Sequence, residues 1–241
     1  MFEEVVVRLL NRRWGKGAGS RPPGFLGYAE NLLGGSSDLL TPEGWLGLGY
    51  THPLTLVIMI IWVIAVASGA VAREVDEGTI EFLASRPVDR RIVLAMRVLL
   101  CVAGLLVLLG AAYLGTIVGT FFVADLRTFS RLAGLRLPAA LLPLLVAIVG
   151  VSFLASVTTS RRSTATAIAI GFAIGSYFLN LAAILWPPLE PLAPLSVFHY
   201  LAPTEWLRHG IVWPDAAIPT SVGAIFLFIA HEAFHRRDLA G

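Results

Sequence analysis

The chain has 241 residues, of which 56% are hydrophobic and only 14% are charged, and its mean hydropathy is +0.78. Soluble domains carry roughly a quarter charged residues, so this composition excludes an ordinary soluble domain and indicates an integral membrane protein. The net charge of +2 and the pI near 9.0 reflect arginines in the loops and do not indicate a nucleic-acid partner. Cys101 is the single cysteine, which excludes an intrachain disulfide bond.

The first 50 residues contain no apolar stretch as long as the roughly 18 to 20 residues that a membrane-spanning helix needs. Apolar residues recur at helical spacing over Phe2–Leu10, which predicts an interfacial helix. Thr41-Pro42-Glu43 is typical of a helix start, with proline at the first helical position. We therefore expect an extracytoplasmic or interfacial segment over residues 1–52 and a membrane domain over residues 53–241.

Five apolar stretches in the membrane domain are predicted to span the membrane, and the last of them is shorter than the others and ends in charge. The predicted spans are Leu54–Ala72, Ile92–Val123, Leu137–Thr159, Ser163–Trp186 and Thr220 to about His235. The second span is long even for a tilted helix. Arg97 lies near one of its ends, and we expect its guanidinium to extend back to the headgroup level.

Small and polar residues inside the spans predict contacts between helices. Ser152, Ser156 and Asn180 are expected to hydrogen-bond across helices, which is more typical of packing than of substrate binding. Glycines at helical spacing are expected to permit close helix packing. These are Gly110, Gly115, Gly119, Gly171 and Gly175.

The loop from Pro187 to Pro219 is rich in proline and carries Trp206 and Trp213. This composition predicts an interfacial cap, with short helical turns between the prolines and with the tryptophans at the headgroup level. An alternative interpretation is that this loop gates the exit path of a substrate.

The stretch from Arg73 to Arg91 is densely charged and too polar to enter a bilayer. Asp76 is placed to cap a short amphipathic helix, which Pro87 would end. Glu77 and Glu81 lie one turn apart on this predicted helix, and such a like-charge pair favours a cationic partner.

This stretch resembles the cytoplasmic segment between the second and third spans of type-2 ATP-binding-cassette (ABC) permeases. The resemblance is carried by Glu74, Glu77-Gly78-Thr79-Ile80-Glu81, Ser85-Arg86-Pro87-Val88 and Arg90-Arg91. The ending Phe234–Leu239 and the stretch Pro203–Gly210 are also similar to parts of that family, so the resemblance runs from about Thr41 to the end of the chain.

The resemblance implies an all-α membrane protein whose cytoplasmic amphipathic coupling helix docks on a separate ABC ATPase subunit. The implied coupling residues are Glu74, Asp76, Glu77, Gly78, Thr79, Glu81 and Arg86. It also implies an exporter in the plasma membrane, paired with a second permease copy or paralogue. The chain contains no G-x-x-x-x-G-K-[ST] phosphate-binding loop, so we expect it to hydrolyse no ATP itself and to bind no cofactor.

Arginines in the short loops predict the orientation, because cytoplasmic loops carry an excess of basic residues. The larger group comprises Arg73, Arg86, Arg90, Arg91, Arg161, Arg162, Arg236 and Arg237. We therefore expect this side, with the C-terminus, to be cytoplasmic, and five spans then place the N-terminus outside. Type-2 permeases normally have six spans, so we expect that the chain starts downstream of a missing first helix. The alternative is a true five-span protein whose amphipathic N-terminal segment lies on the membrane.

One motif indicates a different class of protein. His231-Glu232-Ala233-Phe234-His235 matches H-E-x-x-H, which on a helix places two imidazoles on one face for zinc with a glutamate as general base. A membrane-embedded zinc metalloprotease is therefore the alternative function. A catalytic zinc needs a third protein ligand, for which an acidic residue of the 73–91 stretch is the candidate.

Overall fold

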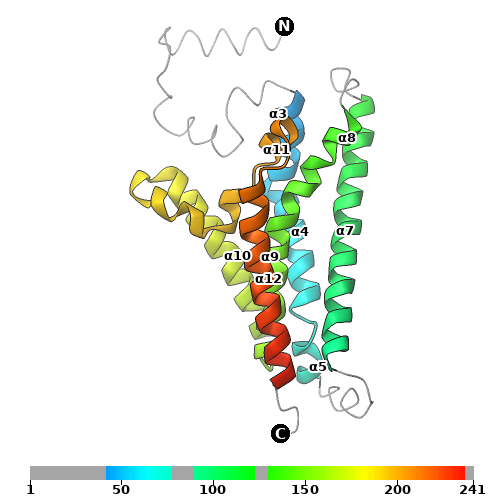
Figure 1. Cartoon of the computed structure of the whole chain (residues 1–241), viewed down its shortest axis with the longest axis vertical. Coiled ribbons are helices and arrows are strands. Elements are labelled where there is room, and N and C mark those ends of the chain that lie inside the picture. Colours follow the sequence, from blue (N-terminus) through cyan, green and yellow to red (C-terminus); the bar gives the residue numbers. More distant parts are fainter. Residues whose placement is uncertain (1–41, 78–89, 123–129, 237–241) are drawn as a thin grey trace.

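A computed structural model describes residues 42–77, 90–122 and 130–236 of the chain (Figure 1). All regular structure in these ranges is helical. The elements are α3 (Pro42–Thr51), α4 (Pro53–Ala67), α5 (Ala72–Asp76), α7 (Arg90–Phe122), α8 (Arg131–Gly134), α9 (Arg136–Thr158), α10 (Arg162–Leu185), η2 (Pro187–Leu195), η3 (Val197–Tyr200), α11 (Pro203–His209) and α12 (Trp213–Arg236). The predicted all-α membrane class is confirmed, whereas the interfacial helix predicted over Phe2–Leu10 lies outside the described residues.

Four of the described helices, α7, α9, α10 and α12, are long and apolar enough to cross a membrane. Helices α3 and α4 meet at an angle of 41°, and together they pass the same test as a broken span or a re-entrant segment. The described chain therefore has four spans, or five if the bent pair counts as one. The bounds of α7, α9 and α10 each lie within two residues of the predicted spans.

The first predicted span, Leu54–Ala72, is wrong at its end, because α4 stops at Ala67 after 15 residues. At 1.5 Å per residue α4 is about 22 Å long, which is shorter than the roughly 30 Å of a bilayer's hydrocarbon core. The chain leaves the helix at Ser68, whose hydroxyl bonds Thr166 of α10 at 2.9 Å. The predicted boundary between residues 52 and 53 falls at the bend between α3 and α4, and this division of the chain stays a prediction.

The last predicted span, Thr220–His235, is wrong at its start, because α12 begins at Trp213 and runs through Pro219. Proline removes one backbone donor from a helix, and membrane helices tolerate this loss where neighbouring helices pack against the bend. Pro219 is buried in α12, so the neighbouring elements cover this turn. The part of the predicted 187–219 loop from Trp213 onward therefore belongs to a span.

Helix α9 is the central helix of the bundle (Figure 1). In its most apolar window 83% of residues are buried, compared with 22% in each of the other three long helices. Its closest neighbour is α12, where the two backbones touch: a Cβ atom on Gly150 would lie 2.8 Å from the Cα atom of Gly223. These two glycines therefore permit the tightest helix contact that the structure describes.

The glycines that were predicted to permit close packing do not do so against the described residues of this chain. A Cβ atom on any of the five would meet nothing within 4 Å. These residues are Gly110, Gly115, Gly119, Gly171 and Gly175. The prediction was wrong because spacing along a helix does not indicate which face lies against a neighbour.

The end of the bundle that carries α3, α8 and α11 is closed by contacts between these short elements and the long helices (Figure 1). Tyr50 of α3 hydrogen-bonds Thr116 of α7 at 2.8 Å. The guanidinium of Arg136, the first residue of α9, donates to the carbonyl of Leu207 in α11 at 3.2 Å. We call this the α11 end, and the opposite end, which carries α5, the α5 end.

The turns of η2, η3 and α11 confirm the predicted short helical turns between the prolines. The two tryptophans of this loop differ in exposure, because Trp206 is 3% exposed whereas Trp213 is 73% exposed. Trp206 is therefore a core residue of the α11 end, and the prediction that the tryptophans lie at the headgroup level stays a prediction.

Candidate coupling site

Three groups of arginines were predicted to share one side of the membrane, and described members of each group lie at the α5 end of the bundle. Arg73 is in α5, Arg161 and Arg162 form the start of α10, and Arg236 ends α12 (Figure 1). Arg162 reaches α4, with its Nη2 atom 3.5 Å from the carbonyl oxygen of Ala65. This end therefore carries basic residues of α5, α10 and α12.

Three of the predicted coupling residues, Glu74, Asp76 and Glu77, are described by the structure. The other four, Gly78, Thr79, Glu81 and Arg86, lie outside the described residues. Asp76 was predicted to cap a helix with Glu77 in its first turn, but this start is wrong, because Asp76 is the last residue of α5 and Glu77 lies in a turn. The rest of the predicted helix lies outside the described residues. Asp76 and Glu77 are both exposed, so α5 presents acidic groups at its surface.

Arg73 and Glu77 form an exposed ion pair one turn apart, with 2.8 Å between Nε and Oε1. The hydrogen bond to Glu77 raises the pKa of the Arg73 guanidinium above its ordinary value. An exposed pair of this kind contributes little to stability, because water screens it and two long side chains lose freedom. Its effect is local, since it orders the side chains at the end of α5.

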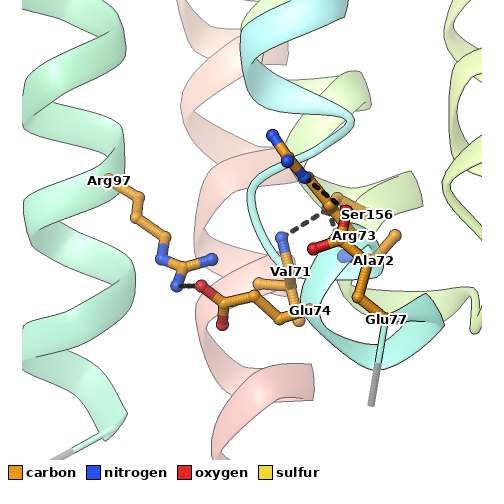
Figure 2. A network of polar contacts seen from close by, with 7 residues as sticks. All are labelled: Val71, Ala72, Arg73, Glu74, Glu77, Arg97 and Ser156. Atoms are coloured by element: carbon orange, nitrogen blue, oxygen red, sulfur yellow. Dashed lines mark hydrogen bonds and ion pairs between the residues drawn. The ribbon is translucent and has the colours of Figure 1, made fainter. Parts of the chain in front are cut away.

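The junction between α4 and α5 is fixed by a serine of the central helix (Figure 2). The Oγ atom of Ser156 accepts hydrogen bonds from the backbone N–H groups of Val71, at 2.9 Å, and Ala72, at 3.0 Å. The first N–H groups of a helix have no partner inside it, and a preceding Ser, Thr, Asp or Asn usually supplies one. Val71 has no side-chain acceptor, so Ser156 of α9 provides this acceptor from another helix.

Small residues allow α5 to approach α9 and α10 closely at the same place. Ala72, Ala155 and Ala165 form a buried apolar cluster, and each is at most 3% exposed. The hydroxyl groups of Ser68 and Thr166 hydrogen-bond beside it. The junction is thus held against α9 and α10 by both packing and hydrogen bonds.

An ion pair ties α5 to a third long helix. Arg97 of α7 donates a hydrogen bond from Nη2 to Oε1 of Glu74 (Figure 2). The two side chains are 21% and 27% exposed, so the pair is largely removed from water. Arg97 was predicted to extend towards headgroups, and the structure gives it a carboxylate of the same chain as its partner.

The predicted cross-helix role is confirmed for Ser156 and is wrong for Ser152. Ser152 lies one turn earlier on α9 and is fully buried, but its hydroxyl donates to the carbonyl of Ile148 in its own helix at 2.7 Å. Asn180 is partly buried on α10, and its cross-helix bond stays a prediction.

A comparison with known protein families shows which family the chain belongs to. The family model described as ABC-2 family transporter protein matches residues 21–239. The chain belongs to the ABC-2 transporter family. It is therefore a multi-pass membrane permease of an ABC transporter, as the resemblance implied. Comparison with curated proteins and with solved structures finds no significant match.

Permeases of the ABC-2 family normally work with an ABC ATPase subunit, and the charged junction at the α5 end is the candidate contact. The sequence analysis missed the hydroxyl pair of Ser68 and Thr166 at this junction, and it missed Arg97 as the partner of Glu74. The opposite charges of Glu74 and Arg97 were a usable signal, because they lie at facing ends of consecutive spans. For Thr166 the sequence offered no signal.

The H-E-x-x-H motif of this ABC-2 permease lies in the last turns of α12, at the α5 end. Glu232 forms an ion pair with Arg236, 2.8 Å away, on the surface of the helix. In the described ranges 42–77, 90–122 and 130–236, no three His, Cys, Asp or Glu side chains gather closely enough to hold a metal ion. These ranges therefore supply no third ligand for the predicted zinc site.

Proposed function

We propose that this chain is the membrane subunit of an ABC exporter in the plasma membrane. A separate ATPase subunit docks on the segment from Ala72 to Arg91 and drives the transport cycle by hydrolysing ATP. The observation that carries this proposal is the junction at the α5 end, where an exposed acidic helix is tied to α7, α9 and α10. An ATPase subunit that binds α5 would therefore act on three long helices at once.

The charge of α5 indicates the chemistry of the docking surface. Asp76 and Glu77 are exposed at the end of α5, where Glu77 is ion-paired with Arg73, and Glu81 follows in the sequence. A cationic surface on the ATPase would complement them, as the like-charge pair of Glu77 and Glu81 predicts.

A second permease chain, either identical or a paralogue, is part of the proposal. The centre of the described bundle is filled by α9 and its buried side chains, so the pathway would have to form at a face of the bundle. Two permease halves would enclose such a pathway between them. Nucleotide-dependent binding of the ATPase to one of two arrangements would then bias the transporter, by an amount equal to the difference in binding free energy.

The proposal is tested by reversing the acidic charges of the segment in chains co-expressed with the partner ATPase. Glu77→Arg combined with Glu81→Arg should abolish co-purification of the ATPase or its stimulation in lipid vesicles. A matched control reverses two exposed glutamates elsewhere in the chain, Glu190→Arg with Glu205→Arg, and should leave both readouts unchanged. Wild-type binding and hydrolysis in the Glu77/Glu81 variant would contradict the proposal.

The orientation is tested separately by cysteine labelling of intact cells. In a chain with Cys101→Ala, a cysteine at Ser85 should resist a membrane-impermeant maleimide, because the proposal places it in the cytoplasm. A cysteine at Leu195, which is 73% exposed beyond the other end of α10, should react. Labelling of position 85 from outside the cell would refute the assignment of this segment to the cytoplasm.

A further inference from the structure

We infer that Ser156 is the positioning residue through which movement of α5 is passed to α9 and, along α9, to the α11 end of the bundle. The inference rests on the proposed function, because it assumes that an ATPase moves α5. It goes beyond that proposal by naming the residue and the helix that carry the movement.

The covalent path from α5 back to α4 is a poor route for such movement. Residues 68–71 between the two helices are not helical, and Gly69 lies among them. A bent connection changes its backbone angles under load, and glycine has the widest choice of angles. Contacts from α5 to other helices are therefore the more rigid path.

The bonds of Ser156 are the most direct of these contacts. They hold backbone N–H groups of Val71 and Ala72, and all three residues are at most 2% exposed. The ion pair between Glu74 and Arg97, in contrast, joins two long side chains that are partly in contact with solvent. A backbone held by a short buried side chain has fewer rotatable bonds between the two helices, so α9 follows α5 more closely than α7 does.

Helix α9 is built to carry a displacement from one end of the bundle to the other. Ser156 lies in its last turn, and Arg136, its first residue, holds the Leu207 carbonyl of α11. The 23 residues between its ends span about 35 Å, close to the thickness of the hydrocarbon core. The backbone contact of Gly150 with Gly223 joins α12 to the same unit. Pro143 lies inside α9 and removes one backbone hydrogen bond, but it is buried, so neighbouring elements cover this turn. A shift at Ser156 would therefore reach α11 along a single helix that is supported where the proline interrupts it.

The chain offers a matched control for this inference. Ser152 and Ser156 lie one turn apart on α9 and both are 0% exposed, but Ser152 bonds only within its own helix. Ser152→Ala and Ser156→Ala remove the same atoms from equally buried positions. A general loss of packing in α9 would affect both variants, whereas a loss of coupling would affect only Ser156→Ala.

The experiment uses the permease with its ATPase in lipid nanodiscs. A bimane fluorophore is attached to a cysteine at Leu132, an 81% exposed position on α8 just before α9, in a Cys101→Ala chain. Trapping the ATPase with ATP and vanadate should shift the bimane emission in the unaltered chain and in Ser152→Ala. Ser156→Ala should lose the shift, although the ATPase still co-purifies. Hydrogen exchange of the amides at 71 and 72 should be faster in Ser156→Ala alone.

A second pair of variants keeps the test decisive if Ser156→Ala does not fold. Ser156→Thr and Ser156→Val introduce β-branched side chains with the same number of non-hydrogen atoms, but only threonine keeps the hydroxyl. The threonine variant should retain the shift and the valine variant should lose it. An equal shift in both, or in Ser156→Ala and the unaltered chain, would overturn the inference. Failure of the unaltered chain to bind the ATPase would instead count against the proposed function.

Discussion

Breaking the ion pair between Glu74 and Arg97 should loosen α5 from α7 by a measurable free energy. Two unit charges about 4 Å apart attract by about 4 kcal/mol at an effective dielectric constant of 20. Lost side-chain freedom and desolvation offset part of this attraction. Exposed pairs contribute about 0–1 kcal/mol, and removing one partner of a buried pair costs about 3–5 kcal/mol. With side chains 21% and 27% exposed, we expect a coupling free energy of about 1–3 kcal/mol.

The measurement is a double-mutant cycle. The variants are Glu74→Gln, Arg97→Gln and the two combined, and the free energy of unfolding is followed by circular dichroism in mixed micelles of a mild detergent and dodecyl sulfate. The combined variant should lose less stability than the sum of the single variants, by the coupling free energy. Exchanging the charges, with Glu74→Arg and Arg97→Glu together, should recover part of the stability that either reversal loses alone.

A control pair lies at the same end of the bundle. Arg236 and Glu232 form an ion pair one turn apart on α12, and the Arg236 side chain is 77% exposed. The same cycle at this pair should yield no more than about 0.5 kcal/mol. If the losses at Glu74 and Arg97 were strictly additive, or if their coupling matched that of the control, the argument that this contact ties α5 to α7 would be refuted.

Three further predictions concern the packing of the bundle and the H-E-x-x-H motif. Gly223→Ala should destabilise the protein by about 1–3 kcal/mol in the same unfolding assay, because the added Cβ atom would overlap the backbone of α9. Gly171 faces open space, so Gly171→Ala should be neutral or should stabilise the protein by up to about 1 kcal/mol. Cysteines at Gly47 and Thr204 should form a disulfide on mild oxidation, seen as a mobility shift on non-reducing gels. A Cβ atom on Gly47 would lie 3.2 Å from the Cβ atom of Thr204, which is a few tenths of an ångström below the roughly 3.5–4.5 Å of a disulfide, so a small shift of α3 from α11 suffices. Metal analysis should find no stoichiometric zinc in the purified protein, and His231→Ala should leave the metal content unchanged.

Each of these predictions has an outcome that would contradict it. Equal stability of the two alanine variants would mean that α9 and α12 are not in backbone contact. A cysteine at Gly49, where nothing lies within 4 Å of the added Cβ atom, is the control for the cross-link, and equal cross-linking from positions 47 and 49 would contradict the packing of α3 on α11. One zinc ion per chain that is lost in His231→Ala would revive the metalloprotease alternative.

The spans that the sequence predicted well are those bounded by strong local signals. Helix α10 begins at Arg162, the second of a pair of arginines, and α7 begins at Arg90 in the charged stretch. Charged residues cannot enter the hydrocarbon core without a partner, so they mark the ends of helices directly. The ends that were predicted wrongly lack such a mark: α4 stops before Ser68 in an apolar stretch, and α12 passes through Pro219.

The amino-acid sequence by itself determined the class, the approximate spans, the charged junction and, through its motifs, the family. The tertiary structure alone decided that α9 is the central helix, that Gly150 and Gly223 are the close-packed glycines, and that Ser156 holds Val71 across 85 residues of chain. The physical reason is that lipid tails and a protein interior are equally apolar. A membrane helix therefore shows no strong contrast between its buried and exposed faces, and its sequence does not indicate which neighbour each face will meet.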